Sequence, residues 1–451
     1  MAAPMSSFRA PHSALRAPMD RRHLLRVGAV STAVSMSGWM GQLARAAEEK
    51  NTKPKRSCIL LWMNGGPSTI DLWDLKPGHE NGGPYKEIEA APALKISEHL
   101  PKLAKHGKNL AVLRGMSTKE GDHARGTYLL RTGQLPGFAG IQYPSIGSLV
   151  SKELGDPKSE LPNFISIAPQ RFFAMDAFGP GFLGPVHAPL IVGDGQFNNG
   201  QGGNIDQILK VADLDRPKNI DEPTSAARLD MLRDMQEEFA TTRPGSMAKS
   251  HAAAYDRAIR LMQSEGGKVF DLTQEKNATR DKYGRNLFGQ GCLLARRLVE
   301  KGVPFIEVTL GNWDTHGQNF DLVKGLSGTL DAAWAALMDD LKDRGLLETT
   351  TIVWAGEFGR TPKINQGKGR DHYPNAWSTV IAGGGVKGGQ AVGKTSKDGT
   401  TVEERVTPAV DFLATVCSAL GIDFEKQNMS NVGRPIRIVD KGAKPVTEVL
   451  A

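Results

Sequence analysis

The chain has 451 residues, with 39% hydrophobic and 6% aromatic residues, and its 56 Lys and Arg against 49 Asp and Glu give a net charge of +7. Glycine is frequent, at 51 residues, whereas three cysteines are too few for a disulfide framework. This composition excludes a disordered acidic chain, a membrane protein with many spans and a small disulfide-rich scaffold. It favours one large α/β domain with insertions, or two domains.

The first 46 residues have the pattern of an export signal. They contain six Arg, no Lys and a single acidic residue, and residues 27–43 carry no charge. Residues 20–26 (Asp-Arg-Arg-His-Leu-Leu-Arg) resemble a twin-arginine signal, and Ala-Arg-Ala at 44–46 is typical of a cleavage site. We therefore expect export by the twin-arginine route to the periplasm or the extracellular space, with 47–57 as a linker. The alternative is a membrane anchor, but 17 weakly hydrophobic residues are marginal for a span, and we expect none in the mature form.

Most of the positive charge belongs to this leader. Removing residues 1–46 takes away six Arg and one Asp, which leaves 50 basic against 48 acidic residues. The mature chain is therefore nearly neutral, and we expect no nucleic-acid partner. Cys58, Cys292 and Cys417 lie far apart in apolar segments, so we expect buried thiols.

Apolar runs that alternate with helical segments predict the architecture of the remaining chain. Strands are expected at 58–63, 110–116, 163–168, 189–193, 303–310, 349–355 and 378–382. Helices are expected at 225–262, 287–301, 328–341 and 408–420. This order indicates an α/β fold with a mostly parallel central sheet and helices on both faces. We expect one domain over 58–440, with a helical insertion around 223–300 and a C-terminal tail at 441–451.

An apolar stripe marks the first part of the helical region. Its members recur at helical spacing among charged residues and are expected to pack into the core: Leu229, Leu232, Met235 and Phe239.

Polar clusters follow or precede several predicted strands, at the edge where open α/β sheets bind ligands. The residues that could carry chemistry there are His123, Arg125, Asp314, His316, Glu357, Arg360, Asp371 and His372. Carboxylates together with imidazoles suit Zn, Mn or Fe. Taken singly, each has a plainer interpretation as a turn cap, a surface imidazole or an ion pair. Together they predict a metal or anion site. Asp71 and Asp74 are either ligands or turn and cap residues.

Five stretches carry a resemblance to a known family: 62–71, 295–303, 313–316, 356–362 and 369–372. They are similar to DUF1501, an uncharacterised family, over about 56–440. That family in turn resembles the alkaline phosphatase and sulfatase superfamily, whose members hydrolyse phosphate or sulfate esters with metal-bound nucleophiles. The resemblance therefore implies an alkaline-phosphatase-like fold.

The resemblance also implies site residues. It places metal ligands at Asp314, His316, Glu357 and His372, with Asp371 as a further candidate because Asp371-His372 is a second possible match to the superfamily's Asp-His-Gly motif. Three positions depart from the superfamily pattern. Phe358 replaces a ligating His, Asn64 stands where a ligating Asp ends the first strand, and His123 stands where a nucleophilic Ser, Thr or Cys is expected. The resemblance therefore leaves open one metal instead of two, and binding without turnover.

The sequence and the resemblance together predict an exported metal-dependent hydrolase of sulfate or phosphate esters. Its substrate would be a small-molecule or polysaccharide ester, such as a sulfated polysaccharide, and its cofactor a divalent Zn, Ca, Mn or Fe ion. His123, Arg125 and Arg360 would stabilise the leaving group and the equatorial oxygens. The nucleophile is either a metal-bound hydroxide or a hydroxyl of Ser68 or Thr69. The alternative is a non-catalytic periplasmic or cell-surface protein that binds a sugar or an anion.

Overall fold

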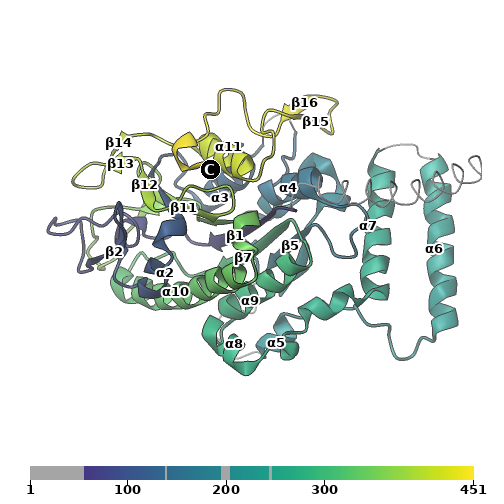
Figure 1. Cartoon of the computed structure of the whole chain (residues 1–451). Coiled ribbons are helices and arrows are strands. Elements are labelled where there is room, and N and C mark those ends of the chain that lie inside the picture. Colours follow the sequence, from purple (N-terminus) through teal and green to yellow (C-terminus); the bar gives the residue numbers. More distant parts are fainter. Residues whose placement is uncertain (1–54, 138–139, 194–203, 243–245) are drawn as a thin grey trace, which may run out of the picture. The chain divides into compact units, whose positions relative to one another are not determined.

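The computed structural model describes residues 55–137, 140–193, 204–242 and 246–451. The predicted signal at 1–46 and most of the predicted linker lie outside these ranges, so both remain predictions. Lys55–Ala451 forms one compact unit. A central sheet crosses this unit, with α3, α4 and α11 on one face and α9 and α10 on the other (Figure 1). The predicted α/β fold is confirmed.

Eight strands form the central sheet. In spatial order they are β12 (Gln390–Val392), β4 (Leu110–Met116), β11 (Trp377–Gly383), β8 (Thr350–Ala355), β1 (Ser57–Met63), β7 (Phe305–Leu310), β5 (Phe164–Ile167) and β6 (Leu190–Val192). The pairings are parallel except for those of β11, which runs antiparallel to both β4 and β8. The start of β11 therefore lies at the edge where the other strands end.

Ten α-helices lie in the described ranges. They are α2 (Pro101–Ala104), α3 (His123–Thr132), α4 (Ile146–Leu154), α5 (Ile205–Ile208), α6 (Glu222–Thr242), α7 (Ser246–Gln263), α8 (Asn277–Tyr283), α9 (Leu287–Glu300), α10 (Asn319–Asp343) and α11 (Ala409–Ala419). Four two-stranded ribbons complete the fold: β2 (Glu87–Ala91) with β3 (Leu94–Ser97), β9 (Gly359–Arg360) with β10 (His372–Tyr373), β13 (Lys394–Thr395) with β14 (Val402–Glu404), and β15 (Gln427–Met429) with β16 (Pro435–Arg437).

The position of β1 inside the sheet, between β8 and β7, explains why its sequence is continuously apolar. Successive side chains of a strand point to opposite faces of the sheet. Ile59 and Leu61 pack into the core that includes α9 and α10, whereas Leu60 and Trp62 pack into the core that includes α4 and α11. Both faces are covered, so no position of β1 is left for a polar side chain to face water. The cysteines behave as predicted, because all three are buried free thiols.

The prediction that the stripe on α6 packs into the core is wrong. Met235 and Phe239 are 59% and 49% exposed, and Leu229 and Leu232 are only partly buried. Helical spacing specifies that apolar side chains share a face, but it does not specify that another element covers that face.

Two further features concern the chain as a whole. Among the described residues, no helix combines the length and apolar character needed to cross a bilayer. The segment 441–451 packs against the domain, since Val446 and Val449 are buried and Leu450 bridges to Val386.

Candidate metal centre

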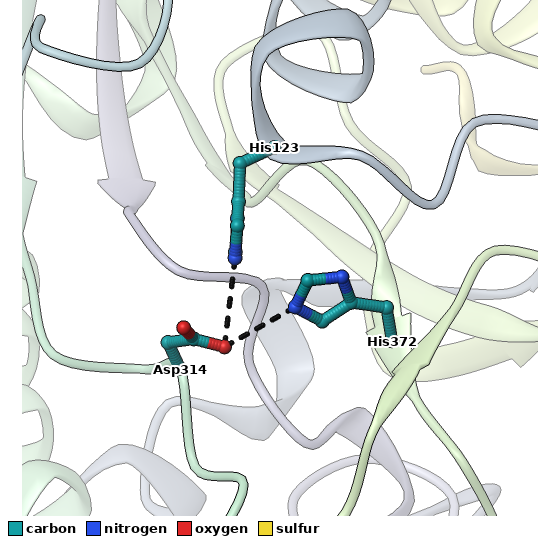
Figure 2. A group of neighbouring side chains, drawn as sticks. All are labelled: His123, Asp314 and His372. Carbon is teal, nitrogen blue, oxygen red and sulfur yellow. Dashed lines mark hydrogen bonds and ion pairs between the residues drawn. The ribbon is translucent and has the colours of Figure 1, made fainter.

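Three side chains from separate loops meet at the edge of the sheet where the parallel strands end: His123, Asp314 and His372. Their ligand atoms all lie within 4.8 Å of one another. Figure 2 shows both imidazole rings directed at one oxygen of the Asp314 carboxylate. His372 Nε2 lies 3.3 Å from that oxygen and His123 Nε2 lies 3.5 Å from it. The sequence had predicted all three as site residues, from clusters 58 to 249 positions apart along the chain.

Helix α3 positions His123 at its first residue. Asp122 caps the helix by accepting from the backbone N–H of Arg125. The imidazole Nδ1 lies 2.7 Å from Oε1 of Glu357, which follows strand β8. That same oxygen accepts from the backbone N–H of Gly65 at 2.9 Å, and Glu357 is completely buried. The loops after β1 and β8 therefore fix the orientation of His123.

Asp314 lies in the loop after β7, against the loop after β1. Gly65 allows this approach, because its φ is +111° and a Cβ there would lie 2.6 Å from the Asp314 nitrogen. Arg360 donates to Asp314 Oδ1 and to the carbonyls of Gly65 and Gly66. The guanidinium therefore both joins the two loops and neutralises the carboxylate.

The short β9–β10 ribbon places His372, which pairs with Arg360 across the two strands. Its Nδ1 lies 2.7 Å from the carbonyl oxygen of Gly121. The ribbon leads into β11, whose antiparallel direction brings its first residue to this edge of the sheet. A parallel strand at this position would have begun at the opposite edge.

His316 lies beside the three residues. Its Nε2 is 3.1 Å from Asp314 Oδ1 and 3.0 Å from His372 Nε2. Its Nδ1 is 2.7 Å from Asp371 Oδ1, an oxygen that also accepts from Asn365 at 3.2 Å. The ring is 46% exposed, so His316 forms the solvent side of the cluster.

The hydrogen bonds of the three imidazoles define which nitrogen is available. In His123, His316 and His372, Nδ1 faces an oxygen acceptor and therefore carries the hydrogen. When a ring is neutral, its Nε2 presents its lone pair to the region around Asp314 Oδ1. His123 Nε2 is buried, and the interaction drawn from it in Figure 2 is the 3.5 Å contact with Asp314 Oδ1. Imidazoles held through Nδ1 by a carboxylate or carbonyl are typical of metal-ligating histidines.

The electrostatics favour a cation at this point. Burial alone would lower the pKa of His123, but hydrogen bonding and charge from Asp314 and Glu357 outweigh it and raise the pKa to about 9. Burial would likewise raise the pKa of Asp314, yet His123, His372 and Arg360 hold that pKa well below its usual range. Two nitrogens and a carboxylate oxygen suit Zn²⁺ and similar borderline ions. The residues present therefore fit a divalent metal.

Glu357 and Arg360 are buried beside the group, whereas Asp371 lies on its exposed side next to His316. The two carboxylates hold Nδ1 of His123 and of His316, and neither belongs to the set of three ligand atoms. Arg360 is 1% exposed and donates to three backbone carbonyls and Asp314. Its donors are used within the protein, and the contact of Arg360 with substrate oxygens stays a prediction.

Two predicted residues do not join the cluster. The Arg125 side chain is 52% exposed and pairs with Glu120 at 2.6 Å. Ser68 is completely buried, and its hydroxyl donates to Asp71 Oδ2 at 2.6 Å. The hydroxyl of Ser68 is thus engaged by a carboxylate, and its role as nucleophile stays a prediction. The alternative Thr69 is also buried, and its hydroxyl accepts from the backbone N–H of Ser378.

Asp71 and Asp74, for which two roles were open, both make interactions within the protein. Asp71 forms a completely buried bidentate ion pair with Arg370, with two distances of 2.9 Å. Asp74 pairs with Lys76 and accepts from Thr395. Neither lies in the metal-type group.

Sequence reasoning missed several groups that shape the site. The Gly121 carbonyl holds His372, and the Asn365 side chain donates to Asp371. The buried Phe358 ring packs against His123 and His372, with centroid distances of 5.1 and 4.7 Å, and so supplies an apolar wall in place of a ligand. Phe173 stacks on His123. Backbone carbonyls and aromatic contacts leave no spacing signal in a sequence, which is why none was predicted.

Asn64 also departs from a ligand role. It accepts from Trp62 Nε1 at 3.3 Å and donates to Gln170 at 3.0 Å. These contacts join the loop after β1 to the loop after β5. Among the described residues, the group that could hold a metal ion is that of His123, Asp314 and His372.

Comparison with solved structures found distant likenesses over most of the chain. Similar structures include the PsFucS1 sulfatase from Pseudoalteromonas sp. (TM-score 0.38, 14% identity, 85% of this chain and 70% of that chain). Others are the lipoteichoic acid synthase LtaP from Listeria monocytogenes (0.41, 10%, 86% and 75%) and an alkaline phosphatase superfamily protein from Vibrio parahaemolyticus (0.36, 14%, 82% and 67%).

The family itself is defined by sequence. Residues 55–450 match the family described as "Protein of unknown function (DUF1501)". The chain belongs to this family, as its motifs had indicated. No curated protein matches the sequence.

Proposed function

We propose that this protein is an exported, metal-dependent hydrolase of sulfate or phosphate esters. The observation that carries the proposal is the convergence of three imidazole Nε2 atoms on Asp314 Oδ1, each ring held through Nδ1 by an oxygen acceptor. The leader at residues 1–46 supports export by the twin-arginine route.

His123, Asp314 and His372 would hold the metal ion, and Glu357 and the Gly121 carbonyl would fix the two rings. When bound, a divalent ion polarises an ester oxygen and lowers the pKa of a coordinated water. The reaction would consume one water and release an alcohol together with sulfate or phosphate.

His316 is placed to carry a proton in this reaction. It is half exposed, its Nδ1 is fixed by Asp371, and its Nε2 faces the centre of the cluster. An imidazole in contact with both solvent and the site can take a proton from water or give one to the departing alcohol at Nε2. Phe358 shields the opposite side of the cluster, where it covers His123 and His372.

A panel of esters tests the proposal. Metal content of the purified mature protein would be measured first, followed by turnover of aryl sulfates, aryl phosphates and phosphate diesters. We expect about one divalent ion per chain and turnover that disappears in His372→Ala and Asp314→Asn. Turnover that persists in both variants would overturn the metal mechanism.

One observation favours a second function, a periplasmic or cell-surface protein that binds a sugar or anion without turnover. Neither Ser68 nor Thr69 offers an exposed hydroxyl, and the resemblance to the superfamily implies that His123 stands where its members have their nucleophile. The same panel separates the two functions, because this one predicts bound metal or sugar and no hydrolysis of any ester.

A further inference from the structure

An exposed aromatic pair adjoins the candidate metal centre. Phe172 and Phe173 lie in the segment after β5, at the same edge of the sheet as the cluster. Their rings are 4.1 Å apart between centroids, and Phe172 is 65% exposed. Phe173 is 39% exposed and stacks on His123, with a centroid distance of 4.8 Å and an interplanar angle of 11°. The aromatic surface is thus continuous with the cluster.

This exposure requires an explanation. Phenylalanine is among the residues that folding buries most strongly, and contiguous apolar side chains on a surface usually mark a binding site. Met175, three residues after Phe172, is also 66% exposed. Apolar rings beside charged metal-type ligands indicate that one part of a ligand is charged and the adjoining part has an apolar face.

We propose that Phe172 and Phe173 form a platform for the pyranose ring of a sugar sulfate or sugar phosphate, whose ester group reaches the metal centre. The inference rests on the proposed function and specifies its substrate class. A pyranose presents C–H groups on its faces and hydroxyl groups around its rim. Polar groups stand next to the two rings in the chain: Arg171, whose Nε is buried without a hydrogen-bond partner, precedes them, and the exposed Asp176 follows three residues after Phe173. An unpartnered donor next to an aromatic surface suits a ligand that carries hydroxyl groups around an apolar face.

Matched pairs of esters separate the contribution of the sugar ring to binding from the contribution of the charged group. Calorimetry on the metal-loaded protein would compare D-glucose 6-sulfate with methyl sulfate, and D-glucose 6-phosphate with methyl phosphate. We expect the ring ester of the preferred anion to bind about tenfold more tightly than its methyl ester. Phe172→Ala should weaken ring-ester binding about five- to tenfold and leave methyl-ester binding within twofold.

Two variants serve as controls. Phe172→Tyr keeps the ring and should keep the affinity difference. Phe239→Ala removes an exposed phenylalanine from α6, a helix that contributes no residue to the cluster, and should change neither affinity. Because Phe172 is largely exposed, its replacement is not expected to impair folding, which thermal unfolding would verify.

The outcomes distinguish the platform from the proposed function. Equal affinities for ring and methyl esters, or no binding of any of the four, would overturn the platform, even if aryl esters are hydrolysed. Tighter binding of 4-nitrophenyl sulfate than of glucose 6-sulfate would overturn it in favour of an aryl substrate. Ring-selective binding that depends on Phe172, without turnover of any ester, would support the platform and contradict the hydrolase.

Discussion

The Nε2 atoms of His316 and His372 lie 3.0 Å apart, although 56 positions separate these residues along the chain. Both nitrogens also face Asp314 Oδ1, at 3.1 and 3.3 Å. Two imidazole lone pairs at this separation repel one another unless a proton or a metal ion lies near them. The protein should therefore be more stable with a cation in this position.

Metal binding should stabilise the folded protein measurably. A ligand at a concentration 100 times its Kd adds about 2.7 kcal/mol to the free energy of unfolding. After treatment with a chelator, addition of Zn²⁺ or Mn²⁺ should raise Tm, and Tm should rise further with metal concentration. His372→Ala should abolish this response, whereas Arg125→Ala should retain it because Arg125 pairs with Glu120 outside the cluster. An equal response in His372→Ala would place the metal elsewhere.

Glu357 should act on metal affinity through His123. Its carboxylate holds Nδ1 at 2.7 Å, and partners of this kind typically change metal affinity about 10- to 100-fold when replaced. Glu357→Gln should therefore weaken metal binding by that range in a calorimetric titration. The matched change Asp371→Asn should have a smaller effect, because Asp371 holds the more exposed His316. A larger loss of metal affinity in Asp371→Asn would show that His316 contributes more to metal binding than His123 does.

The ion pair between Asp71 and Arg370 should contribute to stability. Both side chains are completely buried, and removal of one partner leaves an uncompensated charge, which typically costs about 3–5 kcal/mol. Arg370→Met should lower the free energy of unfolding by this amount in urea titrations. By contrast, Arg125→Ala breaks an exposed pair and should cost less than about 1 kcal/mol. Similar losses of unfolding free energy in both variants would contradict a special contribution of the buried Asp71–Arg370 pair to stability.

Ser68 should be dispensable for turnover. Its buried hydroxyl donates to Asp71, so Ser68→Ala should cost about 1–3 kcal/mol of stability and leave kcat within a few-fold of the parent value. Phosphate or sulfate release from the best aryl ester would measure kcat. A loss of about a thousandfold with an intact fold would support Ser68 as the nucleophile.

His187 should make the protein sensitive to mild acid. Burial, followed by the charges of Arg257 and Lys152, lowers its pKa from 6.5 to about 4. Between these two values the unfolded chain binds a proton that the folded chain does not, so stability is lost as pH falls from about 6.5 to 4. His187→Gln should flatten the dependence of the unfolding free energy on pH in this window. An unchanged slope between pH 7 and pH 5 would contradict the role of His187.

How far the sequence could predict the site depends on the kind of residue. His123, Asp314, His316 and His372 were predicted because each stands beside a strand end, and parallel strands end at one edge. The roles within the site were less accessible. Glu357 and Asp371 were predicted as metal ligands, yet their carboxylates hold Nδ1 atoms of histidines from other segments. Such a distinction depends on a few ångströms between segments that are remote in sequence.

Local pattern determined the α/β class, most strand positions and the burial of the cysteines, because each follows from hydrophobic periodicity along a short segment. Tertiary structure alone decided which faces are covered. Met235 is exposed on α6, whereas Ser68 is buried and hydrogen-bonded to Asp71. Tertiary structure also decided that β11 runs antiparallel, which places His372 at the edge of the sheet where the parallel strands end. The physical reason is that periodicity specifies a side chain's face, whereas the partner on that face comes from a distant part of the chain.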